Sequence, residues 1–119
     1  MILVDTSVWV EHLRRGDPVL AGLLEQQRVL GHLFVLGEIA TGNLRQRTAI
    51  LGALRGLPQA VLAHESEVMD FLEREKLFGT GLGYIDIHLL ASTRLTAGGM
   101  LLTRDKWLLT AATRMSIAA

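Results

Sequence analysis

The chain has 119 residues, no cysteine, and twelve basic side chains balanced by twelve acidic ones. This length fits one domain with its own core, and the absence of thiols excludes cysteine catalysis and cysteine-based zinc sites. No run free of Asp, Glu, Lys and Arg exceeds nine residues, so no membrane span is predicted, and without a signal-peptide pattern the expected compartment is the cytoplasm. The zero formal charge does not support polyanion binding through net charge alone.

Short apolar strands alternate with helices in the first half of the chain. Residues 2–4 predict a strand, and residues 7–15 predict a helix that ends at Gly16. Asp17 followed by Pro18 predicts the start of a second helix, because Asp caps helices and Pro suits their first position. We then expect a strand over residues 28–31, helices over 33–41 and 44–55, and a strand over 60–63.

The same alternation continues in the second half. Residues 65–77 predict an amphipathic helix that is closed by Gly79 in the segment GTGLGY. We expect a helix over 85–96, a strand over 99–103, a helix over 105–113 and a last strand over 116–118. This order predicts an α/β fold whose parallel sheet is covered by helices on both faces. In such sheets the functional residues lie just past the carboxyl ends of the strands.

Two acids follow predicted strands in the same way. Asp5 ends the apolar run of ILVDTSVW, and Asp105 follows the strand of MLLTRDKWLL, each directly before a helix. Asp5 alone has a simple alternative role, because an Asp between a strand and a helix is a good N-cap. The repeated pattern favours a shared site, since parallel strands would bring Asp5 and Asp105 to one edge of the sheet.

Two further acids lie on predicted helices. Asp86 in GYIDIHLLAS has a structural alternative, because the helix dipole favours a negative charge in the first turn. Glu38 in LFVLGEIATG has Phe34 and Val35 as helical neighbours, and an acid on such an apolar face is costly to bury without a partner. No Lys or Arg lies within its reach along the same helix.

Carboxylates that converge without basic partners repel one another, and a divalent cation reverses that balance. All-oxygen ligation points to Mg²⁺ or Mn²⁺, and such a site suits phosphoester hydrolysis by metal-activated water. The predicted ligands and catalytic residues are Asp5, Glu38, Asp86 and Asp105. Three hydroxyls could support these carboxylates or could instead cap helices and turns: Thr6, Ser7 and Thr103.

Several other residues have a simpler interpretation. The histidines never form an i, i+4 pair, so zinc is not predicted, and His88 is expected at the surface or beside the ligands. Trp9 and Trp107 could stack on bases, but their apolar helix positions favour core packing. The glycines of GTGLGY do not have dinucleotide-binding spacing.

Four segments in this order resemble the PIN-domain family, and specifically its VapC-type toxins: VDTSVWV, GEIATG, GYIDIHLLAS and LLTRDKWL. The resemblance covers the whole chain, and the acids of the family's motifs match Asp5, Glu38, Asp86 and Asp105. Ile39 stands where the family more often has leucine.

This resemblance implies a single PIN domain over residues 1–119, with three α/β/α layers around a mostly parallel sheet of four to five strands. It also implies a Mg²⁺- or Mn²⁺-dependent endoribonuclease that acts on structured RNA such as tRNA or rRNA. The expected assembly is a homodimer whose active-site groove is covered by a VapB-like antitoxin.

Other functions compete with this one. An aspartyl-phosphate phosphatase needs a second Asp two residues after Asp5, where this chain has Ser7. A receiver-like regulatory domain would use acids to bind Mg²⁺ but needs a phosphoacceptor at the end of a central strand, and the strand over 60–63 is followed by His64. A PIN fold that only binds RNA is the third possibility, and the complete set of four acids argues against it.

Overall fold

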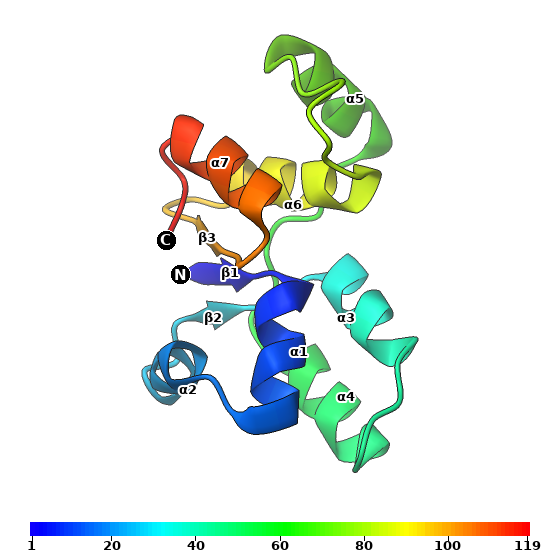
Figure 1. Ribbon diagram of the computed structural model, residues 1–119, viewed down its shortest axis with the longest axis vertical. Helices are drawn as coiled ribbons and strands as arrows, with labels where there is room; N and C mark the ends of the chain where they lie inside the picture. The colour runs from blue at the N-terminus through cyan, green and yellow to red at the C-terminus, as the bar shows by residue number, and fades with distance from the viewer.

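Three short parallel strands form the centre of the computed structural model, which describes residues 1–119 and measures 40 × 26 × 24 Å. They are β1 (Ile2–Val4), β2 (Val29–Leu30) and β3 (Met100–Leu102), in the order β2-β1-β3. Val4 pairs with Leu102 at the ends of β1 and β3. The carboxyl ends of these two strands therefore lie side by side (Figure 1).

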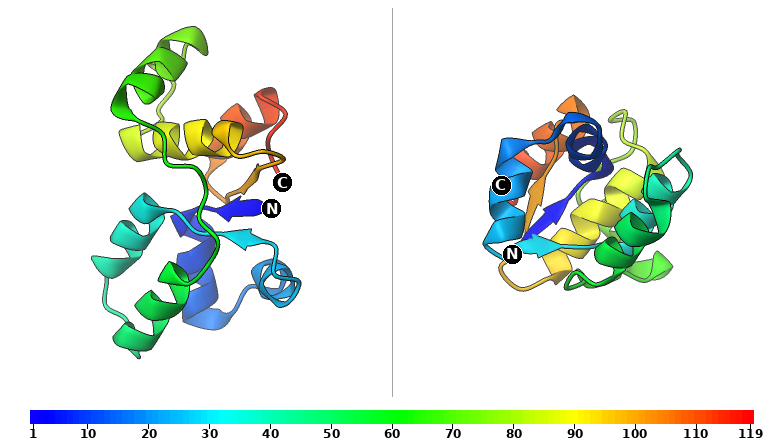
Figure 2. Two further views of the ribbon diagram at one scale, coloured as in Figure 1. Left: turned by 180° about the vertical axis from the view of Figure 1, so that it is seen from behind. Right: turned by 90° about the horizontal axis from the view of Figure 1, so that it is seen from below.

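Seven helices cover this sheet, and the strands lie between helices on both sides (Figure 2, right). Their bounds are α1 (Thr6–Arg15), α2 (Pro18–Glu25), α3 (Leu33–Ala40), α4 (Arg47–Arg55), α5 (Glu65–Arg74), α6 (Tyr84–Leu95) and α7 (Lys106–Arg114). β1 leads directly into α1 and β3 leads into α7, as the sequence predicts. The predicted α/β class with a parallel sheet is confirmed.

The sheet has fewer strands than the predicted four to five. The expected strand over 60–63 is absent, and the nearest pairing is a single parallel bridge between Gly31 and Gln59. The expected strand over 116–118 is reduced to a single parallel bridge between Leu101 and Ala118. Both bridges lie at the outer edges of the sheet. The chain around residues 56–64 is drawn out between α4 and α5, which lie at opposite ends of the molecule (Figure 2, left). A segment that must cover this distance has little length left for pairing.

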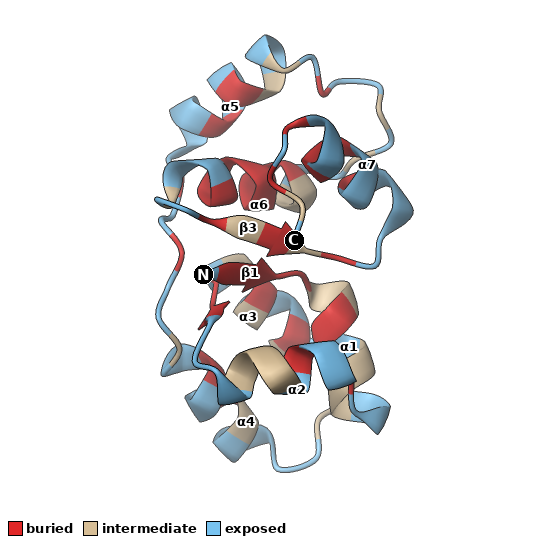
Figure 3. Cartoon of the chain, turned by 90° about the vertical axis from the view of Figure 1, so that its left-hand side faces the viewer, coloured by how far each residue is buried: buried red, intermediate tan, exposed pale blue.

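The apolar strands form the middle of the core because the sheet is covered on both sides. Leu3, Val4 and Leu101 are completely buried, and 27 buried apolar residues form one cluster around them (Figure 3). Parallel strands covered on both faces are expected to be apolar throughout. None of the seven helices combines the length and the apolar composition that a membrane span needs.

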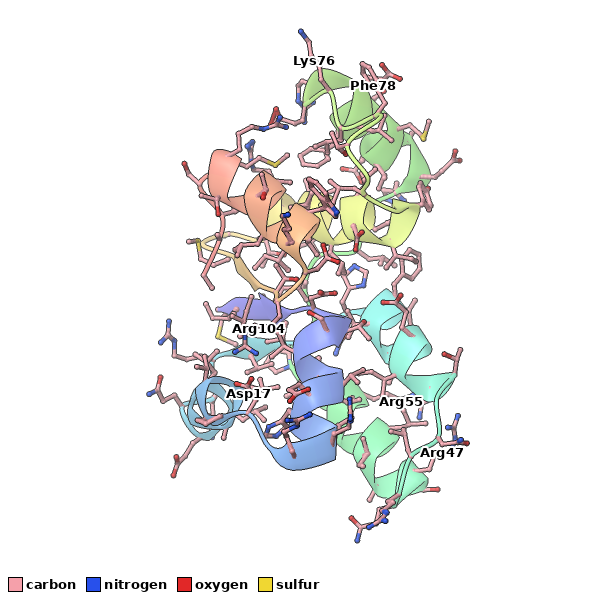
Figure 4. The ribbon with its side chains drawn as sticks, in the orientation of Figure 1. Asp17, Arg47, Arg55, Lys76, Phe78 and Arg104 are labelled. Atoms are coloured by element: carbon pink, nitrogen blue, oxygen red, sulfur yellow. The ribbon has the colours of Figure 1, made fainter.

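Asp17 links the start of α2 to Arg104, which follows β3. Its Oδ1 accepts a hydrogen bond from the Leu20 amide at 3.0 Å, and its Oδ2 accepts one from Arg104 Nη1 at 2.6 Å (Figure 4). The hydrogen bond from Arg104 is the main reason why the pKa of Asp17 falls to about 2. A carboxyl group with a lowered folded pKa stabilises the fold above its unfolded pKa, and this contribution disappears as the pH falls towards 2.

We expect Asp17→Ala to lower the free energy of unfolding by about 1–2 kcal/mol at neutral pH, because it removes a helix cap and an ion pair. Urea denaturation at pH 7 and at pH 3 measures the difference from the wild type, which should shrink at the lower pH. An equal loss at both values would mean that the charge of Asp17 does not contribute.

Candidate active site

Asp5 lies at the carboxyl end of the central strand and is only 6% exposed. It has the N-cap position of α1, but its side chain makes no capping hydrogen bond. Instead, Oδ2 accepts hydrogen bonds from Ser7 Oγ at 2.8 Å and Thr103 Oγ1 at 2.7 Å. Two hydroxyls thus hold the carboxylate in place and compensate for its burial.

Thr103 joins Asp5 to the second acid at this edge. The Asp105 amide donates to Thr103 Oγ1 at 3.0 Å, while that hydroxyl donates to Asp5. Asp105 also caps α7, because its Oδ1 accepts from the Leu108 amide at 2.9 Å. The two acids after β1 and β3 therefore belong to one hydrogen-bond network, as their matching positions in the sequence predict.

Glu38 and Asp86 reach the same edge from helices. Glu38 Oε1 accepts a 2.6 Å hydrogen bond from Thr6, the residue next to Asp5. Asp86 Oδ2 accepts a 3.0 Å bond from the Gly83 amide at the start of α6. Glu38 is exposed, contrary to the concern that an apolar helix face would bury it. The acid side of α3 faces the open edge of the site, so no desolvation cost arises.

The electrostatics of Asp86 indicates that all four acids are neighbours. Burial is the largest cause that raises the pKa of Asp86, and the Gly83 amide partly opposes it. The negative charges of Asp5, Asp105 and Glu38 raise the pKa further. Such mutual effects require short separations, because exposed charges are screened beyond about 8–10 Å.

No basic side chain neutralises this cluster. The three ion pairs of the molecule are Arg15 with Glu11, Arg94 with Glu75, and Arg104 with Asp17. Arg104 is next to Asp105 in sequence, yet its guanidinium points away to Asp17 (Figure 4). The acids thus form a site of uncompensated negative charge.

No three of these side chains are close enough to form a ready coordination shell. Like charges without a cation between them repel, and each of the four carboxylates accepts a local hydrogen bond instead. Asp5 keeps Oδ1 free of protein hydrogen bonds, because both hydroxyls donate to Oδ2. The donor set of carboxylate oxygens fits a hard divalent cation such as Mg²⁺ or Mn²⁺.

Two proteins of Mycobacterium tuberculosis, from strains CDC 1551 / Oshkosh and ATCC 25618 / H37Rv, are similar to this chain along nearly its whole length. Both are named Ribonuclease VapC32, and each is 42% identical over 118 residues, which is 99% of this chain and 95% of the relative. The chain belongs to the VapC family of PIN-domain proteins. No protein-family model matches the VapC-family chain.

Family membership also distinguishes this VapC-family chain from a receiver-like domain. The sequence suggested that the strand over 60–63 would be the relevant central strand, but the central strand is β1. Asp5 therefore does follow the central strand, and strand order does not exclude a phosphoacceptor there. The identity with VapC32 over nearly the whole chain favours the PIN-domain assignment instead.

Two side chains differ in burial from what the sequence suggests. Of the two positions predicted for His88, at the surface or beside the ligands, the surface position is wrong, because His88 is only 4% exposed and α6 is buried over residues 87–93. Its Nδ1 has no hydrogen-bond partner, and its ring packs edge-on against Phe34 and Tyr84. Trp107 was expected in the core but is 55% exposed, whereas Trp9 is buried as predicted.

The spacing of α7 contains the signal that could have shown the position of Trp107. The buried residues of this segment are Leu108, Ala111, Ala112 and Met115. They follow an i, i+3, i+4, i+7 pattern, which defines one helix face. Trp107 lies outside that pattern, directly beside the candidate site.

Proposed function

We propose that this chain is a divalent-metal-dependent endoribonuclease toxin that hydrolyses phosphodiester bonds in RNA. The observation that carries the proposal is the set of four carboxylates at one sheet edge, which has no basic partner. Burial, and then the negative charges of the other three acids, raise the pKa of Asp86. The name of the relatives, Ribonuclease VapC32, supports RNA as the substrate class.

In this proposal Asp5, Glu38, Asp86 and Asp105 hold Mg²⁺ or Mn²⁺ and are the catalytic residues. The bound metal would supply positive charge to the phosphate oxygens and an activated water. The protein's own contribution is to orient these carboxylates. Thr6 holds Glu38, while Ser7 and Thr103 hold Asp5, and such supporting hydrogen bonds strengthen metal sites.

A groove beside Glu38 is the proposed site of a VapB-like antitoxin. It has a volume of about 730 Å³ and lies between α1 and the segment that follows α3. Val10, Leu13 and Ile39 make it partly apolar, and Arg14 and Arg45 add positive charge. A segment bound there would reach the acid site at Glu38. This arrangement would couple antitoxin binding to loss of activity.

The remaining features of the proposal follow the VapC family. We propose that residues 1–119 act as a single PIN domain in the cytoplasm and form a homodimer. The exposed apolar side chains, which include Val61, Leu62 and Met69, are consistent with covered surface in an assembly. A loop of a structured RNA such as tRNA or rRNA is the proposed substrate.

The direct test is an RNA-cleavage assay with the purified chain, combined with a growth assay after induced expression. We expect growth arrest, cleavage with Mg²⁺ or Mn²⁺, loss of cleavage with EDTA, and recovery when excess Mg²⁺ is added. Co-expression with the neighbouring small reading frame should restore growth if it encodes the antitoxin. Cleavage that persists in EDTA would contradict metal dependence.

We expect Thr103→Val to reduce RNA cleavage about 10- to 100-fold, because it removes a hydroxyl that orients the Asp5 carboxylate. Valine has nearly the same shape, so the main change is the loss of the bonds to Asp5 and from the Asp105 amide. Cleavage rates at several Mg²⁺ concentrations measure the effect, which should include weaker apparent metal affinity.

Thr93→Val is the matched control for this substitution. Thr93 is also buried, but its hydroxyl donates to the Leu89 carbonyl within α6, away from the acids. Its variant should keep wild-type cleavage with at most a modest loss of stability. Equal losses of activity in both variants would indicate a general folding effect.

A further inference from the structure

Trp107 exposes a large aromatic surface beside the acid site. It is 55% exposed in the first turn of α7, two residues after Asp105. The buried face of α7 is formed by other residues, so the fold does not need the indole for its core. An exposed tryptophan with no packing role is a candidate for ligand contact.

Gly81 lies beside the indole of Trp107. Gly81 has φ +86°, and a Cβ atom at this position would lie 3.9 Å from Cγ, Cδ1 and Cδ2 of Trp107. Equal distances to three ring atoms mean that this Cβ direction points at the ring face, where a larger residue would meet the indole at ordinary van der Waals distance. More than half of the Trp107 side chain is open to solvent.

The same loop connects Trp107 to the acids. It descends from α5 beside α7 (Figure 3), and it contacts Trp107 through Gly81. Two residues later the Gly83 amide donates to Asp86. The loop over residues 79–83 thus faces the indole at Gly81 and bonds an acid of the cluster at Gly83.

A groove of about 570 Å³ runs between this loop and α7. Leu77 and Leu82 give it an apolar lining, and Thr80, Thr110 and Arg114 add polar groups. Lys106 Nζ lies 5.1 Å from the centroid of the Trp107 ring. This volume is in the range of small-molecule sites, so it has room for a nucleobase.

We propose that Trp107 is a stacking platform for a base of single-stranded RNA next to the phosphate that is cleaved. The inference rests on the proposed ribonuclease function and assigns this residue to substrate positioning. A planar indole offers a face that any base can stack on. Lys106 and Arg114 carry positive charge that can bind the phosphate groups of the RNA, whereas the four acids bind the metal.

Charge complementarity favours RNA over a second copy of the chain. The groove is lined by Trp107 and Arg114, and Lys106 Nζ lies 5.1 Å from the centroid of the indole. Asp105, the N-cap residue of the same helix, is two residues before Trp107. A dimer contact would bring these cations against the same cations of the partner if the interface were symmetric. RNA places a negative phosphate on both sides of every base.

Fluorescence provides a test that does not require catalysis. Trp9 and Trp107 are the two tryptophans, and Trp9 is buried, so Trp9→Phe leaves Trp107 as the reporter. This variant is titrated in EDTA with a short single-stranded oligoribonucleotide of mixed sequence and with the same sequence as a duplex. We expect quenching of Trp107 by the single strand and weaker quenching by the duplex.

Substitutions of Trp107 in the wild-type background complete the test. We expect Trp107→Leu to weaken binding of the single strand about 10-fold, in the range known for base stacking. Trp107→Phe should recover most of the affinity because it keeps an aromatic face. Leu109→Ala, an exposed apolar residue on the same helix, is the control and should bind as the wild type does.

The outcomes separate this inference from the proposed function. If Trp107→Leu cleaves RNA with unchanged affinity and KM, the stacking site is wrong and the proposed ribonuclease function is unaffected. Quenching by RNA without any cleavage would support the stacking site and contradict the enzyme. A Trp107 signal that changes with protein concentration or with added antitoxin, but not with RNA, would overturn the inference in favour of a protein interface.

Discussion

Asp5→Asn is expected to abolish RNA cleavage while the protein stays folded. Asparagine has the same shape and can accept the hydrogen bonds of Ser7 and Thr103, but it lacks the charge that a metal ligand needs. We expect more than a 100-fold loss, since even partners outside the ligand set are worth about 10- to 100-fold. Cleavage rates with saturating Mg²⁺ measure it, and induced expression should no longer arrest growth.

The stability of Asp5→Asn should not fall together with its activity. Removing one of four mutually repelling charges relieves strain in the metal-free protein, so the melting temperature of Asp5→Asn should equal or exceed that of the wild type. Asp70→Asn removes an exposed acid on α5 and should leave activity unchanged. An Asp5→Asn protein that still cleaves RNA at near the wild-type rate, or still arrests growth, would show that Asp5 is not a catalytic ligand.

Low pH is expected to destabilise the fold through His32, which is buried at the start of α3. Its Nδ1 accepts from the Phe34 amide, so in the neutral ring Nε2 carries the proton and donates to Ser92 Oγ at 2.9 Å. Burial is the main cause that lowers the pKa of His32 to about 4, and the charge of His88 adds to it. Protonation would remove the acceptor that caps α3.

The direction of this pH dependence follows from the pKa of His32 in the folded chain and in the unfolded chain. Below pH 6.5 the unfolded chain takes up a proton at this histidine and the folded chain does not, so stability is lost as the pH falls from 6.5 to 4. We expect this loss to reach about 2–3 kcal/mol. Urea denaturation at several pH values between 7 and 4 measures it.

His32→Asn provides the comparison, because asparagine can cap the helix but does not titrate. The variant should be less stable at pH 7, since it leaves Ser92 without its partner. Its stability should depend less on pH between 6.5 and 4 than that of the wild type. Parallel pH curves for the two proteins would mean that another group causes the acid sensitivity.

The sequence was sufficient to predict the seven helices and the strands β1, β2 and β3 in their order, but two further predicted strands, over 60–63 and 116–118, are absent as strands. Apolar runs of three or four residues before helices mark β1 and β3, and their pattern predicts that Asp5 and Asp105 lie together. Capping chemistry located the start of α2 at Asp17 and Pro18. These features depend on local chemistry, which the sequence contains directly.

Other properties depend on tertiary packing and could not be predicted in this way. The residues over 60–63 are apolar enough for a strand, but they lie in a segment that is drawn out between α4 and α5, and the nearest bridge is at Gln59. His88 is buried because α6 packs in the middle of the fold. Arg104 turns away from the acids because Asp17, far away in sequence, offers a better partner.

Diffraction from a crystal grown with Mn²⁺ tests most directly whether the four acids share one metal site. An anomalous difference map recorded near the manganese absorption edge locates the ion without assumptions about activity. We predict a peak within about 2.5 Å of carboxylate oxygens from at least two of Asp5, Glu38, Asp86 and Asp105, and no such peak in crystals of Asp5→Asn. A map of the wild-type protein without a peak among these acids, or with the ion held by other residues, would contradict the shared metal site.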